Sequence, residues 1–381
     1  MLAVLMVASA CAVRAPTADD PPRHPPIDLD VVDLTWWFTC PTRTTEPTGC
    51  LAGPASGVAG ARVLGPSPRV VVDEPGLVVT GSELGEVRVA AADVVLVGID
   101  AEVVVFEPTA DRGRLVGSRV GSVFVSGADE VTLVENLLRP SDPGPDVVQI
   151  KRFDGDPVRG LTVAGNVVGP QDASGDRHTD CVQVLDGNDL VFVRNLVGPC
   201  GDKAFQIRSG AGGRVGRVLL GWNMVMECRP RRDGCDGFHA VTWAVDGDAR
   251  LELVHNSIAG SVALSTSGSS RPAAGRLVAI ANIADALPCA AAGDAWANLV
   301  AGDGGTCPGE FGGSVEWVDA PAGDLHLRSR VVFAGDAPGV VGSAADPVTA
   351  NSGFAALLEG PDVDGQLACG PLQLGADLVC P

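Results

Sequence analysis

Charged side chains that could do chemistry gather in two polar stretches and in the segment between them. The stretches are GPQDASGDRHTDC (169–181) and CRPRRDGCDGFH (228–239), and GDKAFQIRSG (201–210) lies between them. Cationic side chains suit an anionic ligand, and carboxylates supply the hard oxygen ligands that calcium takes. The candidate residues are Asp176, Arg177, His178, Asp180, Lys203, Arg208, Arg231, Arg232, Asp236 and His239.

The elements that must position these residues form a repeat between Val131 and Ala284. An apolar strand, an Asn and two mostly apolar residues recur six times, at steps of 30, 29, 28, 33 and 26 residues. Such a period indicates stacked units, none of which can bury its apolar face alone. The units are short and β-branched, and Gly, Pro, Asp and Asn interrupt them, so they are strands and turns. The repeated asparagines are Asn136, Asn166, Asn195, Asn223, Asn256 and Asn282.

Two properties of Asn suit it to such a repeat. Asn tolerates the left-handed backbone conformation of a sharp bend, and stacked Asn amides can bond to one another. A second set of strands, centred on Gln149, Gln183 and Gln206, alternates with the Asn strands, and HAVTWAV and ALSTSGS continue it without Gln. At least two strands per coil predict an all-β parallel β-helix of three strands per turn, from about residue 60 to 310.

This alternation resembles the right-handed parallel β-helix proteins of the pectate lyase superfamily. Those enzymes carry a His-Asp-Gly strand, an Asn-Ser or Asn-Asn strand, an Asp-Lys strand and an Arg-Pro-Arg-like segment. This chain has a similar order over about 60 residues, although the Arg-x-Pro-x-x-Arg spacing of the family is not kept. The matching segments are His178-Thr-Asp180-Cys, Arg194-Asn195, Asp202-Lys203 and Arg229-Pro-Arg231-Arg232.

The resemblance implies a lyase that cleaves an acidic, uronate-containing polysaccharide by elimination. Asp180, with Asp176, would bind calcium, and Lys203 would hold a substrate carboxylate. Arg231 or Arg232 would be the base that takes the proton beside that carboxylate. The expected substrate-binding residues are His178, Arg208 and His239.

The sequence also fits a second function. A non-catalytic surface protein could use the same fold to bind glycan or another cell-surface partner.

Three other kinds of site are not indicated by the sequence. His178 and Cys181 lack a second Cys/His pair at zinc spacing, which disfavours a zinc site. GAGGRVG (210–216) joins strand to strand, so it indicates a turn rather than a dinucleotide loop. The Asn-Thr-Asp, Asp-Asp, Gly-His-Gly and Arg-Ile-Lys motifs of the related polygalacturonate hydrolases do not occur in the coils, which disfavours paired-carboxylate hydrolysis.

Charge and the first residues bear on location. The net charge of −20 argues against a nucleic-acid partner, which needs a basic surface. The segment MLAVLMVASAC is too short for a membrane span and is typical of the end of a secretion signal. Ala-Ser-Ala-Cys resembles a bacterial lipobox, so we expect a secreted monomer with a lipid on Cys11 and a tether over residues 12–26. A plain signal peptide and a misassigned start codon are the alternatives.

Eleven cysteines suit an oxidising compartment, and ten remain when Cys11 is set aside. Cys200 and Cys228 each follow a repeated Asn by five residues, which predicts a disulfide between adjacent coils. Cys181–Cys200 and Cys228–Cys235 are the alternatives. Pairs expected between sequence neighbours are Cys40–Cys50, Cys289–Cys307 and Cys369–Cys380.

The ends of the chain are expected to close the solenoid. Residues 27–60 include Trp36, Trp37 and Phe38, which would cap the open first coil, and 61–130 would form early coils without Asn. Residues 311–381 would form an irregular tail. It resembles the ends of secreted β-helix proteins in GDLHL (323–327), DVDG (362–365) and LGAD (374–377).

Overall fold

The computed structural model describes the protein over most of residues 61–300 and in three short strands beyond. The described ranges are 61–140, 146–171, 179–210, 212–226, 239–245, 249–265, 276–280, 282–288, 292–296, 298–300, 311–312, 317–319 and 324–327. The predicted cap at 27–60, the signal with Cys11 and most of the tail lie outside these residues. No helix within the described ranges is long and apolar enough to cross a membrane.

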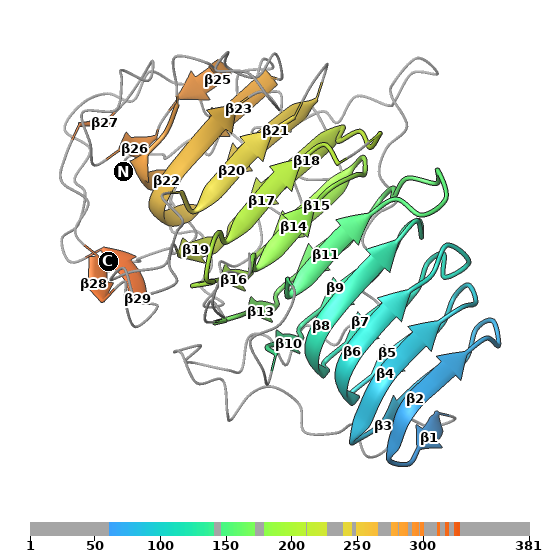
Figure 1. The fold of residues 1–381 in the computed structure, drawn as a ribbon. Helices are drawn as coiled ribbons and strands as arrows, with labels where there is room; N and C mark the ends of the chain where they lie inside the picture. The colour runs from blue at the N-terminus through green and yellow to red at the C-terminus, as the bar shows by residue number, and fades with distance from the viewer. Residues whose placement is uncertain are drawn as a thin grey trace, which may run out of the picture.

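One wall of the molecule is an 11-stranded parallel sheet, to which each coil contributes one strand. Successive strands lie side by side along the helix axis (Figure 1). The strands are β1 (Arg62–Leu64), β3 (Val78–Gly81), β5 (Val95–Val97), β7 (Arg114–Val116), β9 (Thr132–Val134), β12 (Thr162–Ala164), β15 (Leu190–Val193), β18 (Arg217–Gly221), β21 (Arg250–Val254), β23 (Arg276–Ile280) and β25 (Ala292–Trp296).

The second, 16-stranded sheet divides in the middle of the molecule. Its first strands are β2 (Ser67–Val72), β4 (Leu84–Val89), β6 (Asp100–Phe106) and β8 (Arg119–Ser126). One branch after β8 holds β10 (Leu137–Leu138), β13 (Val167–Val168), β16 (Leu196–Val197) and β19 (Met224–Met226). The other holds β11 (Val148–Lys151), β14 (Val182–Val184), β17 (Phe205–Arg208) and β20 (Val241–Ala244).

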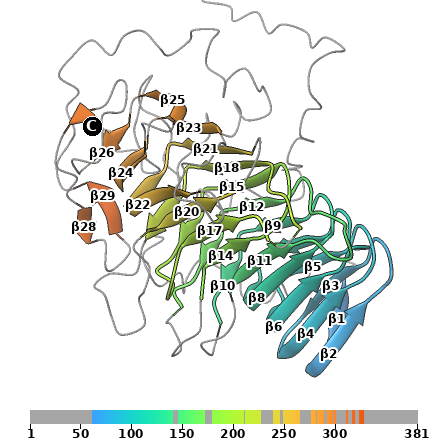
Figure 2. The same ribbon diagram turned by 45° about the horizontal axis from the view of Figure 1, so that its top comes forward.

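The long strand β22 (Ser257–Ser265) pairs with both β19 and β20, so it joins the branches again. Beyond it, β24 (Ile283–Ala286), β26 (Leu299–Val300) and β27 (Phe311–Gly312) continue the sheet. The two walls face each other in both views (Figures 1 and 2), and the buried hydrophobic cluster comes from strands of both. An antiparallel pair, β28 (Trp317–Asp319) and β29 (Asp324–Leu327), contains the predicted DLHL strand.

The fold is a right-handed parallel β-helix, as the repeat and its resemblance predicted. All coil-to-coil pairings are parallel, and such crossovers are right-handed in nearly all proteins. The early coils have two strands, the second of which is bent, whereas the coils from β9 to β20 have three, as expected. Membership of the pectate lyase superfamily stays a prediction.

Columns of stacked Val, Leu and Phe side chains fill the interior. Val87, Val104, Val123, Val148 and Val182 occupy one register position on successive coils, and all are fully buried. Burying each such side chain stabilises the fold by about 1.5–3 kcal/mol. Because the core is aliphatic and shared by neighbouring coils, no coil is stable alone.

The six repeated asparagines form one column, which confirms the prediction, and Asn298 extends it by one coil. All are completely buried. In each step the side-chain oxygen of one Asn accepts both the backbone N–H and the side-chain amide of the preceding Asn, at 2.8–3.0 Å. In the preceding coil Ser118 takes the place of Asn, and its backbone N–H donates to Asn136.

The proposed left-handed role of Asn was wrong. From Asn136 to Asn256, the positive φ belongs to the residue before each Asn, for example Arg194 (φ 55°), Trp222 (φ 53°) and His255 (φ 54°). A residue in that conformation turns the chain sharply, which directs the following Asn side chain into the coil. The asparagines are therefore selected for their paired donor and acceptor, not for their backbone freedom.

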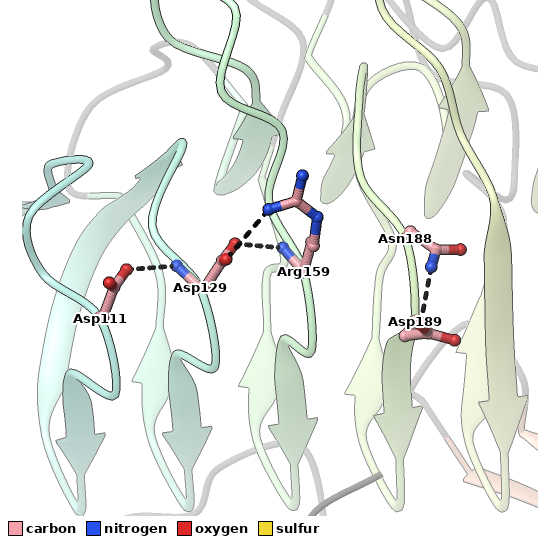
Figure 3. Close-up of polar contacts among 5 residues, drawn as sticks. All are labelled: Asp111, Asp129, Arg159, Asn188 and Asp189. Carbon is pink, nitrogen blue, oxygen red and sulfur yellow. Dashed lines mark hydrogen bonds and ion pairs between the residues drawn. The ribbon is translucent and has the colours of Figure 1, made fainter. Parts of the chain in front are cut away.

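A different polar column joins the turns that lead into the 11-stranded sheet (Figure 3). An oxygen of Asp111 accepts the backbone N–H of Asp129 at 2.9 Å. Asp129 in turn accepts the backbone and guanidinium N–H groups of Arg159, at 3.0 and 3.2 Å. Asn188 accepts the N–H of Arg217 at 2.9 Å. These side chains satisfy backbone donors that the turn leaves unpaired, which is a structural role.

One disulfide lies within the described residues, between Cys181 and Cys200. It was one of the two alternatives, and it corrects the preferred Cys200–Cys228 pairing. Cys181 precedes β14 and Cys200 precedes β17, so the bridge joins adjacent coils, with Cα atoms 5.4 Å apart. The spacing from Asn to Cys200 and Cys228 missed it because Cys181 follows its own Asn, Asn166, by 15 residues rather than five. The other predicted pairs lie outside the described residues.

Candidate functional site

Four ionisable residues, three of which the sequence predicted, share one register position on successive coils. Strands β11, β14, β17 and β20 pair through Val148, Val182, Phe205 and Val241. Two residues before each of these stand, in turn, Asp146, Asp180, Lys203 and His239. We call this set the charged column. It follows the connections from β10, β13, β16 and β19, at one corner of the helix that we call the insertion corner.

Beside the charged column runs the predicted column of glutamines. The amide nitrogen of Gln149 donates to Gln183 at 3.0 Å, and that of Gln183 donates to Gln206 at 3.2 Å. The same nitrogens also reach the carboxylates three residues earlier, Asp146 at 3.1 Å and Asp180 at 3.2 Å. The glutamines therefore fix the two carboxylates in place.

The two aspartates are buried and joined to each other. One oxygen of Asp146 accepts the backbone N–H of Asp180 at 2.9 Å. Asp180 is fully buried and Asp146 is 5% exposed. A buried carboxylate needs such donors, because desolvation without them is costly. The sequence gave Asp146 no role, since the register between coils was unknown.

Lys203 lies in the short connection between β16 and β17, where it forms an ion pair with Asp202. Their side chains are 17% and 11% exposed. The backbone N–H of Asp202 donates to Thr179 at 2.9 Å, and that of Cys181 donates to Lys203 at 2.9 Å. These bonds and the neighbouring disulfide hold the Asp202–Lys203 ion pair against the coil that contains Asp180.

His239 and Arg208 are the remaining candidates within the described residues. His239 has its Nδ1 2.7 Å from the hydroxyl oxygen of Ser261, a residue that the sequence did not indicate. Arg208 is exposed at the end of β17, two residues after Gln206, so both side chains leave the same face of the strand. Asp180, Lys203, Arg208 and His239 are thus confined to adjacent coils.

Several predicted residues lie outside the described part of the chain. These are Asp176, Arg177, His178, Arg231, Arg232 and Asp236. Their roles stay predictions, and the segments that hold them connect β13 to β14 and β19 to β20 at the insertion corner.

The described residues alone do not form a calcium site. They contain no cluster of three or more His, Cys, Asp or Glu side chains placed to hold a metal ion. Asp146 and Asp180 already use three carboxylate oxygens as hydrogen-bond acceptors. Calcium takes six to eight oxygen ligands, so these two residues do not fit it without further donors. Calcium binding stays a proposal that needs Asp176.

Comparisons with known proteins add one similar structure. No protein-family model matches the chain, and no curated protein matches it. Among solved structures, that of the Dettilon tailspike protein (gp208) is similar at 13% sequence identity, with a TM-score of 0.38. The match covers 66% of this chain and 59% of that chain, so it spans less than two thirds of the tailspike protein.

Proposed function

We propose that the protein binds an acidic, uronate-containing polysaccharide at the insertion corner. The supporting observation is the charged column, in which four adjacent coils place ionisable side chains at one register position beside stacked amides. Lys203 before β17 and Arg208 at its end suit sugar carboxylates, and amides suit sugar hydroxyls. The proposal includes secretion and a lipid anchor on Cys11, with the protein acting as a monomer.

Binding without cleavage has the stronger support. An elimination site needs a cation free to stabilise the charge that develops beside the uronate carboxylate. Lys203 is instead paired with Asp202, which neutralises part of its charge. A ligand carboxylate would have to compete with Asp202 for the ammonium group.

Cleavage by elimination is the second candidate, favoured by the placement of Asp180 and Lys203 on neighbouring coils. Lys203 would hold the substrate carboxylate, and Arg231 or Arg232 would remove the adjacent proton. A calcium ion at Asp176 and Asp180 would neutralise part of the developing negative charge. His178, Arg208 and His239 would orient the sugar chain.

The test measures binding of pectate, alginate and a glycosaminoglycan by calorimetry. Lys203→Ala should weaken binding by about tenfold, the loss of one charge-assisted hydrogen bond. Asp202→Asn should strengthen binding, because it frees the ammonium group. Arg159→Ala, which removes an ion-paired cation from the opposite turns, is the matched control and should leave affinity unchanged. Equal affinity of all four proteins for every polymer would reject the site.

Absorbance separates the two candidates. Elimination produces a conjugated, unsaturated uronate that absorbs near the ultraviolet edge, so its appearance, and its loss with a chelator, would establish a calcium-dependent lyase. Binding with no new absorbance on any polymer supports the non-catalytic function. Cleavage that survives both Lys203→Ala and Arg232→Ala would place the active site elsewhere.

A further inference from the structure

A groove of about 650 Å³ crosses the first coils and ends at the coil on which the charged column begins. It lies where strands β4, β6 and β8 bend. Glu83 and Asp100 line it on one side of the bend, and Glu102 lies at the bend itself. Arg119 and Arg139 line its end nearer the middle of the molecule. Groove volumes of this size accommodate small-molecule ligands.

Glycine forms the floor of the groove. Gly85 and Gly121 occupy the bend in β4 and β8, and Glu102 stands between them in register. A Cβ at Gly85 would lie 2.3 Å from the carbonyl oxygen of Pro68, and one at Gly121 would lie 2.3 Å from that of Glu102. A side chain at either glycine would meet the backbone of the preceding coil, so at these two positions the backbone itself lines the groove. The paired register is interrupted at these positions and resumes on both sides.

The five charged residues of the groove form no ion pair or side-chain hydrogen bond with any described residue. All five are exposed. Their neighbours behave differently: on the same strands Arg88 contacts Glu86 at 2.8 Å and Glu107 at 3.3 Å. Charged groups that line one groove and have no partner among the described residues can bind a ligand there.

We infer that this groove is a second carbohydrate subsite, which holds a linear glycan parallel to the helix axis. It spans five successive coils, or about 19 Å at the usual spacing of strands. None of its lining residues is aromatic, and Leu84 is the one large apolar residue among them. A protein partner would need aromatic or aliphatic anchors, whereas a sugar chain needs hydrogen-bonding groups.

The order of charges predicts the chemistry of the bound segment. Carboxylates of Glu83, Asp100 and Glu102 would accept hydrogen bonds from hydroxyls of uncharged sugar groups. Arg119 and Arg139 would bind a sugar carboxylate, which a guanidinium group can grip with two bonds. The preferred ligand is therefore a polymer in which hydroxyl-rich and anionic units follow one another.

The groove belongs to the same corner of the helix as the charged column. Leu138 pairs with Val120, and Val148 pairs with Val123. Gly121 is therefore in register with both Arg139 and Asp146, which lie near the two ends of the connection from β10 to β11. This inference rests on the proposed function, and extends it from one site to a path along several coils.

The experiment compares polymer affinity among variants, with hyaluronan, in which charged and uncharged units alternate, as the probe and alginate, in which every unit is a uronate, as the comparison. Arg119→Gln combined with Arg139→Gln should lower the affinity for hyaluronan by about tenfold or more. Glu102→Gln should lower it less, because the amide still accepts a hydrogen bond. Arg112→Gln, an exposed arginine of the opposite turns, is the control. All substitutions are at exposed side chains, and the denaturation midpoint checks that each variant folds.

The outcomes separate the inference from the proposed function. Loss of affinity in the Arg119/Arg139 variant supports the groove as a binding site. If Lys203→Ala then binds normally, the groove is supported and the charged column is not. An effect of Lys203→Ala without one of the Arg119/Arg139 variant overturns the groove and leaves the proposed function intact. If neither changes affinity, both fail. If the groove variant instead alters the sedimentation of the free protein, a second copy of the chain occupies the groove, and the inference is wrong.

Discussion

A single buried amide in the asparagine column satisfies several backbone and side-chain groups at once. Asn195 accepts two N–H groups from Asn166, at 2.8 and 3.0 Å. Its own amide donates to the carbonyl of Val163 and to Asn223, both at 2.9 Å. Because no water reaches this position, truncation leaves these partners unsatisfied, at about 1–3 kcal/mol each.

We therefore predict that Asn195→Ala destabilises the protein by about 3 kcal/mol or more. The free energy of the first unfolding transition in urea measures the loss, since a solenoid need not unfold in one step. Asn188→Ala is the matched control. Asn188 is exposed, so water can replace its bond to Arg217 and the loss should be about 1 kcal/mol. Equal losses for the two variants would contradict a special role for the buried column.

At this scale the sequence indicates residue types better than conformations. The period of Asn identifies the column because identical amides can stack only in register. It does not show that the left-handed residue is the one before, since Glu135, Arg194, Trp222 and His255 share no chemical property. The charged column was harder to predict, because the insertions between its members differ in length and hide the register.

At the scale of elements, the bend in the long strands depends on glycine. We predict that Gly121→Ala lowers stability by about 1–3 kcal/mol, because its Cβ would press on the carbonyl of Glu102. Gly65→Ala is the control, since a Cβ there meets nothing within 4 Å. Urea denaturation of both variants measures the difference. A neutral Gly121→Ala would mean that neighbouring coils can move apart at the bend.

The turns of the early coils are held by exposed ion pairs, and one of them shifts a pKa. Hydrogen bonds at 2.7 Å from the Arg112 guanidinium lower the pKa of Asp93 below its ordinary value of 3.8. The folded protein thus binds this proton less tightly than the unfolded chain. The small stabilisation is complete above pH 3.8 and is lost as the pH falls through the folded-state pKa.

We predict that Arg112→Gln raises the pKa of Asp93 back toward its ordinary value. NMR titration of the carboxyl group measures it directly. Arg62→Gln breaks a similar exposed pair with Glu74 and should leave the titration of Asp93 unchanged. A pKa of Asp93 that stays low in Arg112→Gln would assign the shift to Arg114 instead.

The elements were predictable where their pattern repeats and not where it lapses. The parallel coils, the Gln strands and the early Val-rich strands follow from alternation and spacing. The groove was not predictable, because the coils of Gly85 and Gly121 carry no Asn and these glycines resemble ordinary turn residues. The second sheet divides into two branches where the polar stretches 169–181 and 228–239 separate its strands. The sequence located these stretches but could not show that they lie at one corner of the helix.

At the scale of the whole molecule, the net charge of −20 opposes the binding of an acidic polymer. The cations proposed to bind it are local, whereas the repulsion comes from the entire surface. Salt screens interactions beyond about 8 Å at physiological ionic strength and affects close contacts less. Long-range repulsion should therefore disappear first as salt is added.

We predict that the association rate constant for alginate rises between low and physiological salt, while the dissociation rate changes little. Stopped-flow or surface-based kinetics over a salt series provides the measurement. A neutral polysaccharide of similar length is the control and should show no trend, since it has no charge to repel. An association rate that falls with salt would show that local cations, rather than the total charge, govern the encounter. In that case Arg119, Arg139 and Lys203 would steer the polymer as well as hold it.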